Sequence, residues 1–199
     1  MSRHKTDTSD MNRPLNTLVH IRTGHTFRCR ISEDPAGEIP LVQIRDLRGC
    51  LWIAADQLPR IRRPRGKGAA PVRPGDVLLP ACGEHYQAAI LQGTEPAITT
   101  NQIYVLAPKS ARLRMDFLAW HLNQRAAQHY FKTHCSGSNI PMLNIASLGA
   151  LPVPLPSIDI QDKIVRLYRI WTEEKAITER LINNREILLT AIFQRLLEP

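Results

Sequence analysis

The chain has 199 residues, a length that fits one core domain with a smaller appendage. Its 26 Lys and Arg residues against 18 Asp and Glu give a net charge of +8, which makes a polyanion the first partner to consider. No apolar run approaches the ~18 residues of a membrane-spanning helix, and the four cysteines form no CxxC pair. We therefore expect a soluble cytoplasmic protein with free thiols, without a disulfide framework, a structural zinc site or a membrane partner.

Residues 1–13 are polar and lack the apolar stretch of a signal peptide, so we expect a disordered N-terminal tail. From residue 14 to about residue 111, short runs rich in β-branched and aromatic residues alternate with turn signals such as Pro74-Gly75. These runs are Ile39–Leu47, Gly49–Ile53, Asp76–Leu79, Tyr86–Leu91 and Gln102–Leu106. Their spacing predicts a compact, mainly antiparallel sheet rather than βαβ units.

A helix is predicted from about Met115 to Thr133, because apolar residues recur there at steps of three and four. Its wide apolar face indicates packing into the core of the sheet domain. Gly137 follows and can supply the left-handed conformation that ends a helix. The next segment, residues 151–156, alternates apolar residues with prolines, which predicts a stiff connector or an edge strand. A proline-rich ligand for another domain is the alternative interpretation of that segment.

From Ser157 onward the chain has no Gly, and no Pro before Pro199, so one helix is predicted to run to about Leu197. A seam with alternating steps of four and three follows this helix and is interrupted in the middle by polar residues. Its apolar members are Ile160, Ile164, Leu167, Trp171, Leu181, Leu188 and Ile192. About 38 residues make a rod of roughly 57 Å, which predicts a coiled coil with a partner helix. An amphipathic helix folded back on the sheet is the alternative.

Together these elements predict an α+β fold. A compact, mainly antiparallel sheet domain with a packed helix would be followed by one long C-terminal coiled-coil helix. The expected boundaries are residues 1–13 for the tail, residues 14–156 for the sheet domain and residues 157–199 for the long helix. The long helix would then join two copies of the chain.

No motif for catalysis, a metal or a cofactor stands out in the sequence. The seven histidines form no HExxH or other helical metal pair, and no cysteine or serine lies in a nucleophile signature. Gly66-Lys67 lacks both the first glycine and the hydroxyl residue of a phosphate-binding GxxxxGK[ST] loop. We therefore expect a protein that is not an enzyme and that carries no metal or cofactor of its own.

The strongest local charge feature is a run of five cations within eight residues. Its cations are Arg60, Arg62, Arg63, Arg65 and Lys67. Pro64 and Gly66 disfavour regular structure and unpaired charges cannot be buried, so an exposed loop is expected. Because arginine suits bidentate contact with phosphates and guanine edges, DNA binding is the functional interpretation, and a solvated loop is the alternative. Lys132, with Ser138 and Asn139 in the loop after it, is a second candidate phosphate contact, for which a plain helix end is the alternative.

Several motifs in a fixed order carry a family resemblance. They are Gly37–Asp46, Pro74–Leu79, Asn101-Gln102, Gly137–Leu143 and Leu151–Ser157, followed by Gln161 and Ile164-Val165. In this order, ahead of a long helix, they resemble the DNA-specificity subunits of type I restriction–modification systems over about residues 14–197. Typical members carry two recognition domains and two spacer helices, so the chain resembles a half-sized specificity subunit. It departs from the family at Ile160, where a Glu usually precedes the Gln.

The resemblance implies a non-catalytic subunit that recognises a sequence in double-stranded DNA. Its partners would be an adenine methyltransferase subunit, which binds the S-adenosylmethionine, and, for cleavage, a translocating endonuclease (restriction) subunit. The long helix would pair antiparallel with that of a second copy, and this homodimer would read inverted half-sites at most about 17 base pairs apart. A stand-alone dimeric DNA-binding protein, such as a repressor, and a coiled-coil assembly protein are the alternatives.

Overall fold

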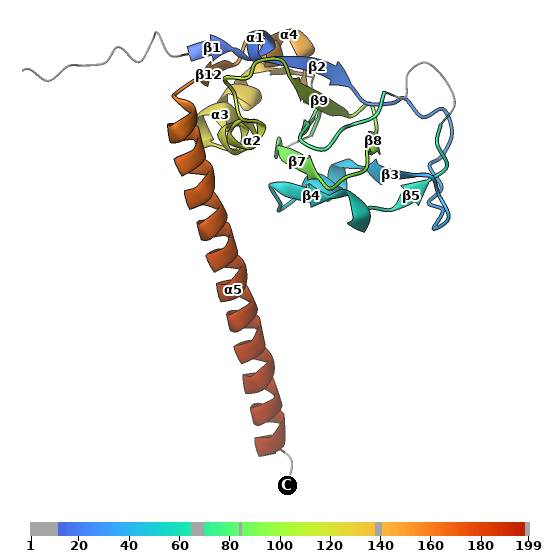
Figure 1. The fold of residues 1–199 in the computed structure, drawn as a ribbon. Coiled ribbons are helices and arrows are strands. Elements are labelled where there is room, and N and C mark those ends of the chain that lie inside the picture. Colours follow the sequence, from blue (N-terminus) through green and yellow to red (C-terminus); the bar gives the residue numbers. More distant parts are fainter. Residues whose placement is uncertain (1–11, 65–69, 84, 138–140, 198–199) are drawn as a thin grey trace, which may run out of the picture. The chain divides into compact units, whose positions relative to one another are not determined.

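The computed structural model describes residues 12–64, 70–83, 85–137 and 141–197 (Figure 1). The chain forms two compact units, residues 1–161 and residues 162–199. The first unit holds the strands and short helices of the described residues, and the second consists of most of one long helix. This combination of sheets, packed helices and a long C-terminal helix confirms the predicted α+β fold.

Two sheets build the core of the first unit (Figure 1). The larger has five strands in the order β2 (Val19–Thr23), β9 (Ile103–Pro108), β6 (Val77–Pro80), β7 (Ala89–Gln92) and β4 (Trp52–Ala54). The smaller has three, in the order β5 (Arg60–Ile61), β3 (Ile39–Val42) and β8 (Ile98–Thr99). Neighbouring strands are antiparallel except β4 with β7 and β3 with β8. The prediction of a mainly antiparallel sheet is confirmed, and each run predicted as a strand contributes one.

Two short antiparallel ribbons complete the strands of the first unit. Strand β1 (Asn12–Pro14) pairs with β12 (Pro152–Pro154), and β10 (Cys135–Ser136) pairs with β11 (Met142–Leu143). The proline-rich segment is therefore an edge strand, one of its two predicted forms. The predicted N-terminal tail is wrong at its last two residues, which pair with β12 from the far end of the unit. The rest of that tail lies outside the described residues.

Short helices connect the strands. They are α1 (Leu15–Leu18), α2 (Met115–Leu122), α3 (Arg125–His134) and α4 (Ile145–Gly149), with two 3₁₀ helices, η1 (Ile44–Leu47) and η2 (Ala55–Gln57). The buried faces of α2 and α3 confirm that the helical region packs into the core, with Phe117, Leu118 and Phe131 almost fully buried. The four cysteines of the chain are all free thiols.

The single helix predicted from Met115 to Thr133 is wrong, because the chain breaks it at Asn123. The Asn123 amide donates to the carbonyl of Ala88 and accepts from its N–H, both at 2.8 Å. Just beyond the break, the Gln128 amide donates to the carbonyl of Leu122 at 2.7 Å and so satisfies the end of α2. Hydrogen bonds from Asn and Gln side chains to the backbone compete with helix propagation, and each contributes about 1 kcal/mol.

His121 on α2 gives the first unit a pH-dependent stability. Burial lowers the pKa of its imidazole below the usual 6.5, and its Nε2 has no hydrogen-bond partner among the described residues. Folded His121 therefore stays neutral to a lower pH than His121 of the unfolded chain, which binds a proton below about pH 6.5. Stability attributable to this residue is complete above that pH and falls as the pH drops through it, by up to about 1.4 kcal/mol per pH unit.

We expect the wild-type protein to lose more of its unfolding free energy than His121→Gln when the pH falls from about 7.5 to about 5.5, by at most about 1.4 kcal/mol. Urea unfolding at the two pH values measures the loss, and the comparison removes the contribution of every other titrating group. Equal losses in the two proteins would contradict a neutral buried imidazole.

The long helix is α5 (Ile158–Leu197), a continuous helix of 40 residues and therefore about 60 Å long, whose first turn belongs to the first unit and whose remainder forms the second. These bounds confirm the predicted extent of the helix, which is based on the absence of Gly and Pro from this part of the sequence. Large apolar side chains are exposed along its length, among them Leu167, Trp171, Leu181 and Leu188, of which between 52% and 68% is accessible. Pairing of this helix with another stays a prediction. In the part of the chain that the structure describes, no helix is both long and apolar enough to span a membrane.

Candidate nucleic-acid interface

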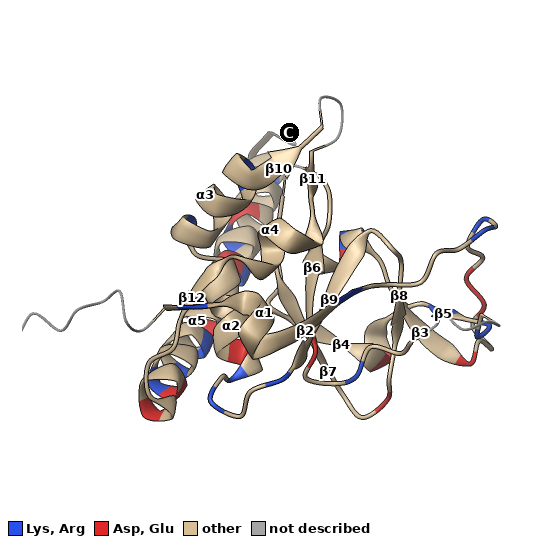
Figure 2. Cartoon of the chain, turned by 90° about the horizontal axis from the view of Figure 1, so that it is seen from above, with Lys and Arg blue, Asp and Glu red and all other residues tan. Residues whose placement is uncertain are grey.

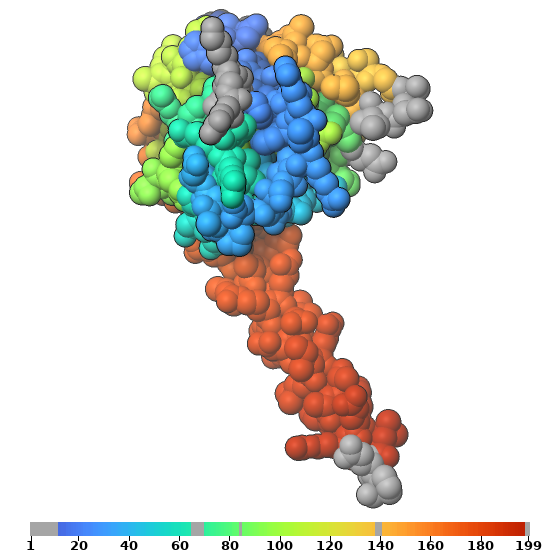
Figure 3. Space-filling view, turned by 90° about the vertical axis from the view of Figure 1, so that its right-hand side faces the viewer, coloured from blue at the N-terminus to red at the C-terminus, as the bar shows by residue number. Residues whose placement is uncertain are grey.

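A groove of about 1190 Å³ lies beside the three-stranded sheet. Its walls are residues 23–34 on one side and Ile61, Arg62 and Pro64 on the other, and we call it the arginine groove. Figure 3 shows this face of the first unit, where residues 23–34 (blue) and the region of β5 (teal) lie side by side. The volume exceeds the roughly 300–1,000 Å³ of typical small-molecule sites, which favours part of a larger ligand.

The alternation of apolar and basic residues shapes one wall of the groove. Phe27 and Ile31 pack against the apolar cluster of Ile39, Leu41, Ile61 and Ile98. Arg28, Cys29 and Arg30 lie between these two anchors and are exposed to solvent. The segment has no regular secondary structure, but its two apolar residues fix it to the core. It therefore holds the two arginines at the surface.

The N-terminal end of the same wall is fixed by the backbone. The N–H of His25 donates to the carbonyl of Thr99 at 2.7 Å, and its ring contacts Phe27 edge-on, with the centroids 4.8 Å apart. A side chain at Gly24 would place its Cβ only 2.2 Å from the carbonyl oxygen of Thr100. The close approach of the two backbones therefore requires glycine at this position.

Arg60 does not lie in an exposed loop, so that part of the prediction is wrong. It belongs to β5, and its guanidinium donates to both carboxylate oxygens of Glu95, at 2.8 and 3.1 Å. Its Nε also donates to the carbonyl of Gly37 at 2.9 Å, and the hydrogen bonds to Glu95 raise the pKa of the guanidinium. The sequence could not show this arrangement because Glu95 comes from a distant segment. DNA contact by Arg60 stays untested.

Arg62 and Arg63 are exposed, as predicted for the basic run. The Nε of Arg62 lies 3.2 Å from Asp34 Oδ2, yet 87% of the Arg62 side chain remains accessible. Asp34 is also held in place by the N–H of Ala36, which donates to Oδ1 at 3.0 Å. The last two cations of the predicted run, Arg65 and Lys67, lie outside the described residues.

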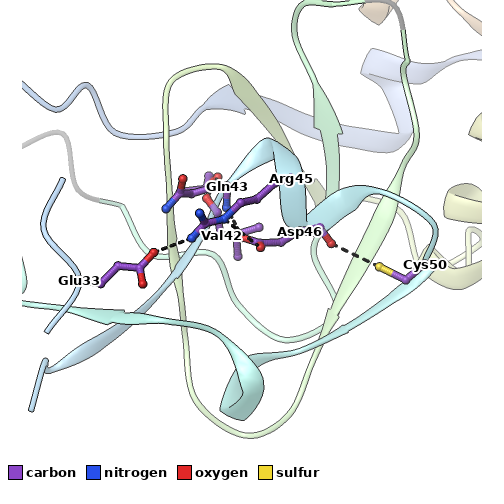
Figure 4. A network of polar contacts seen from close by, with 7 residues as sticks. Glu33, Val42, Gln43, Arg45, Asp46 and Cys50 are labelled. Atoms are coloured by element: carbon purple, nitrogen blue, oxygen red, sulfur yellow. Dashed lines mark hydrogen bonds and ion pairs between the residues drawn. The ribbon is translucent and has the colours of Figure 1, made fainter. Parts of the chain in front are cut away.

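A second acidic residue of the groove, Glu33, is also paired (Figure 4). Its carboxylate contacts the guanidinium of Arg45 in η1. A capping box holds η1 in place: the Asp46 carboxylate accepts from the N–H of Gln43 at 2.7 Å, and the Gln43 side chain accepts from the N–H of Asp46. Glu33 and Asp34, the two acidic residues of the groove lining, therefore each form an ion pair with an arginine.

The second predicted phosphate contact lies elsewhere. Lys132 is exposed on α3, and Figures 1 and 2 place α3 and β5 at opposite ends of the first unit. Ser138 and Asn139 lie outside the described residues. The structure therefore does not bring Lys132 together with the Arg60–Arg63 part of the basic run.

Sequence inspection missed Arg28 and Arg30. The available signal was two arginines flanked by apolar residues in Phe27-Arg-Cys-Arg-Ile31, which is less dense in charge than the later run. Within the described ranges, no three His, Cys, Asp or Glu side chains are grouped to hold a metal ion. The chemistry that the groove offers is the binding of a negatively charged ligand by guanidinium groups.

The sequence matches a known protein family. The sequence profile of the type I restriction modification DNA specificity domain matches residues 11–184. The chain belongs to this family. The resemblance to specificity subunits drawn from the ordered motifs is confirmed. A search of curated proteins found no match to the sequence.

Solved structures share the fold of this specificity-domain chain at low sequence identity. A chain from a type I restriction–modification system, solved to explain complex assembly and conformational transition, is 19% identical with a TM-score of 0.70, over 98% of this chain and 46% of that chain. The HsdS subunit of Thermoanaerobacter tengcongensis is 18% identical with a TM-score of 0.63, over 90% and 42%. The S subunit of M. genitalium is 14% identical with a TM-score of 0.58, over 88% and 42%. This specificity-domain chain thus spans less than half the length of each.

Proposed function

We propose that the chain is the DNA-recognition subunit of a type I restriction–modification complex and that it binds double-stranded DNA through the arginine groove. The observation that carries the proposal is the family match over residues 11–184. The net charge of +8 and the exposed arginines of the groove support it, because phosphate charge dominates the affinity of proteins for DNA. Residues 14–156 would form the recognition domain and residues 157–199 the spacer helix.

The partners follow from the family. An adenine methyltransferase subunit would bind S-adenosylmethionine and transfer the methyl group, and an endonuclease subunit would join for cleavage. The chain itself would only direct these subunits to the target. The guanidinium groups of its groove are suited to binding phosphates and base edges.

A homodimer would supply the second recognition domain. The chain has one long helix with exposed apolar side chains, and it spans less than half of the subunits it matches. Two copies paired through α5 would bury those side chains and present two identical grooves. Twofold symmetry would then require inverted half-sites in the DNA.

Selection from a library of random duplexes tests the proposal. We expect the purified chain to enrich an inverted repeat, and we expect methylated adenine only after a type I methyltransferase subunit from the same genome is added. Failure to bind any duplex at low salt would contradict the proposal and favour a coiled-coil assembly protein. Enrichment without association with the methyltransferase subunit would favour a stand-alone DNA-binding dimer. Methyl transfer by the chain alone would contradict the non-catalytic role.

A further inference from the structure

We infer that Arg28 and Arg30 make the phosphate contacts in the arginine groove, whereas Arg60 and Arg62 hold its walls in place. The inference rests on the proposed function and deepens it, since it divides the arginines of one site into two roles. The sequence alone favours the run beginning at Arg60 as the DNA contact, because that run has the higher density of charge.

The pairing of charges around the groove separates the two roles. Arg60 is bound by Glu95 and Arg62 by Asp34, so each contributes a pair with no net charge. The remaining carboxylate of the groove belongs to Glu33, which pairs with an arginine outside it. Within the described part of the chain, no carboxylate pairs with Arg28 or Arg30. These two guanidinium groups are the unbalanced positive charge of the lining.

The position of the two arginines also suits phosphates. Both lie on an exposed stretch that Phe27 and Ile31 fix to the core at either side, so the backbone that carries them is already ordered. An ordered backbone lowers the entropy lost on binding. A guanidinium group carries a full positive charge and can donate to phosphate oxygens, and both arginines line the same groove.

The paired arginines have a structural role that fits their contacts. Arg60 joins β5 to Glu95 and to the carbonyl of Gly37, where an added Cβ would lie only 2.6 Å from the backbone nitrogen of Ile61. Asp34, the partner of Arg62, also donates its N–H to the carbonyl of Arg60 at 2.8 Å. These bonds keep the segment that follows the groove wall against the small sheet.

The salt dependence of DNA binding tests the assignment. Each phosphate contact contributes about 0.9 to the slope of log K against log salt concentration. We expect Arg28→Ala with Arg30→Ala to reduce that slope by about 2, and Arg28→Lys with Arg30→Lys to retain it. The control is Lys175→Ala with Glu179→Ala, which removes an exposed ion pair on α5, outside the groove lining, without changing the net charge, and should leave the slope unchanged.

The outcomes separate this inference from the proposed function. If the wild-type chain binds no duplex, the proposed function fails. If the wild type binds and the Arg28/Arg30 alanine variant keeps its slope, only the inference is overturned. A lysine variant whose slope falls as far as that of the alanine variant would also overturn it, because phosphate contact requires charge rather than the guanidinium fork.

Cys29 provides a second test that leaves both arginines intact. It is exposed between them, whereas Cys50, Cys82 and Cys135 are each partly buried. We expect bound duplex DNA to slow maleimide labelling of Cys29 by about tenfold or more, as expected for a residue inside a wet but covered interface. In Cys29→Ser, DNA should not change the labelling of the other thiols. Unchanged labelling of Cys29 in the complex would overturn the inference even if the arginine variants failed to fold.

Discussion

Replacing Leu181 and Leu188 with Asp is expected to convert the proposed homodimer into monomers. Both side chains are more than half exposed on the isolated helix, at 52% and 59%. They lie seven residues apart and therefore on one face of α5. A twofold dimer would bury four such leucines, each stabilised by about 1.5–3 kcal/mol on burial. Losing that term and placing carboxylates at the seam should weaken association by more than about a thousandfold.

Sedimentation velocity at micromolar concentration measures this change, with a matched control on the same helix. Asn183 and Thr190 are also seven residues apart and exposed, on the side of α5 opposite the two leucines. Asn183→Asp with Thr190→Asp adds the same two charges without touching the seam and should stay dimeric. A dimer that persists in the Leu181/Leu188 variant would refute pairing through this face.

The Leu181/Leu188 variant also tests whether dimerisation through α5 contributes to DNA binding. A monomer keeps one complete groove, because the groove is built within residues 23–64 of the first unit. We expect it to bind a single half-site as the wild type does, and to lose only the gain from engaging two half-sites at once. Loss of half-site binding as well would show that the helix is needed for the fold of the recognition domain.

Features that depend on the local sequence could be predicted. The long helix follows from forty residues without Gly or Pro and from an apolar pattern of helical period. The strands around Val77, Ile90 and Val105 follow from short β-branched and aromatic runs between turns. In each case the decisive information lies within a few residues of the element itself.

Features that depend on tertiary partners could not be predicted. The break at Asn123 exists because its amide binds the backbone of Ala88, which lies just before β7 and is distant in sequence. The sequence suggests that the arginines of the basic run are unpaired, because it does not show that Glu95 and Asp34 form ion pairs with Arg60 and Arg62. Charge density in a sequence is therefore a weak guide to net charge at a site, since ion pairs are formed between segments.

Replacing Gln161 with Leu is expected to destabilise the first unit strongly. Gln161 was part of the family resemblance, and the structure shows what it binds: its side chain is fully buried at the start of α5. Its Oε1 accepts from the N–H of Arg114, and its Nε2 donates to the carbonyls of Arg112 and Pro156, each at 2.9 Å. One amide thus satisfies three backbone groups from the segment before α2 and the segment before α5.

Leucine has nearly the same size but can neither donate nor accept, so all three backbone groups would lose this partner. Each unsatisfied buried group costs about 1–3 kcal/mol, which predicts a loss of about 3 kcal/mol or more from a domain whose total stability is on the order of 5–15 kcal/mol. Urea unfolding followed by near-UV circular dichroism measures it. The same substitution at exposed Gln57 should change stability by less than about 0.5 kcal/mol. If the two variants lose equal stability, the buried amide does not hold these segments together. The role of the Gln161 side chain would then have to be sought in the assembled complex.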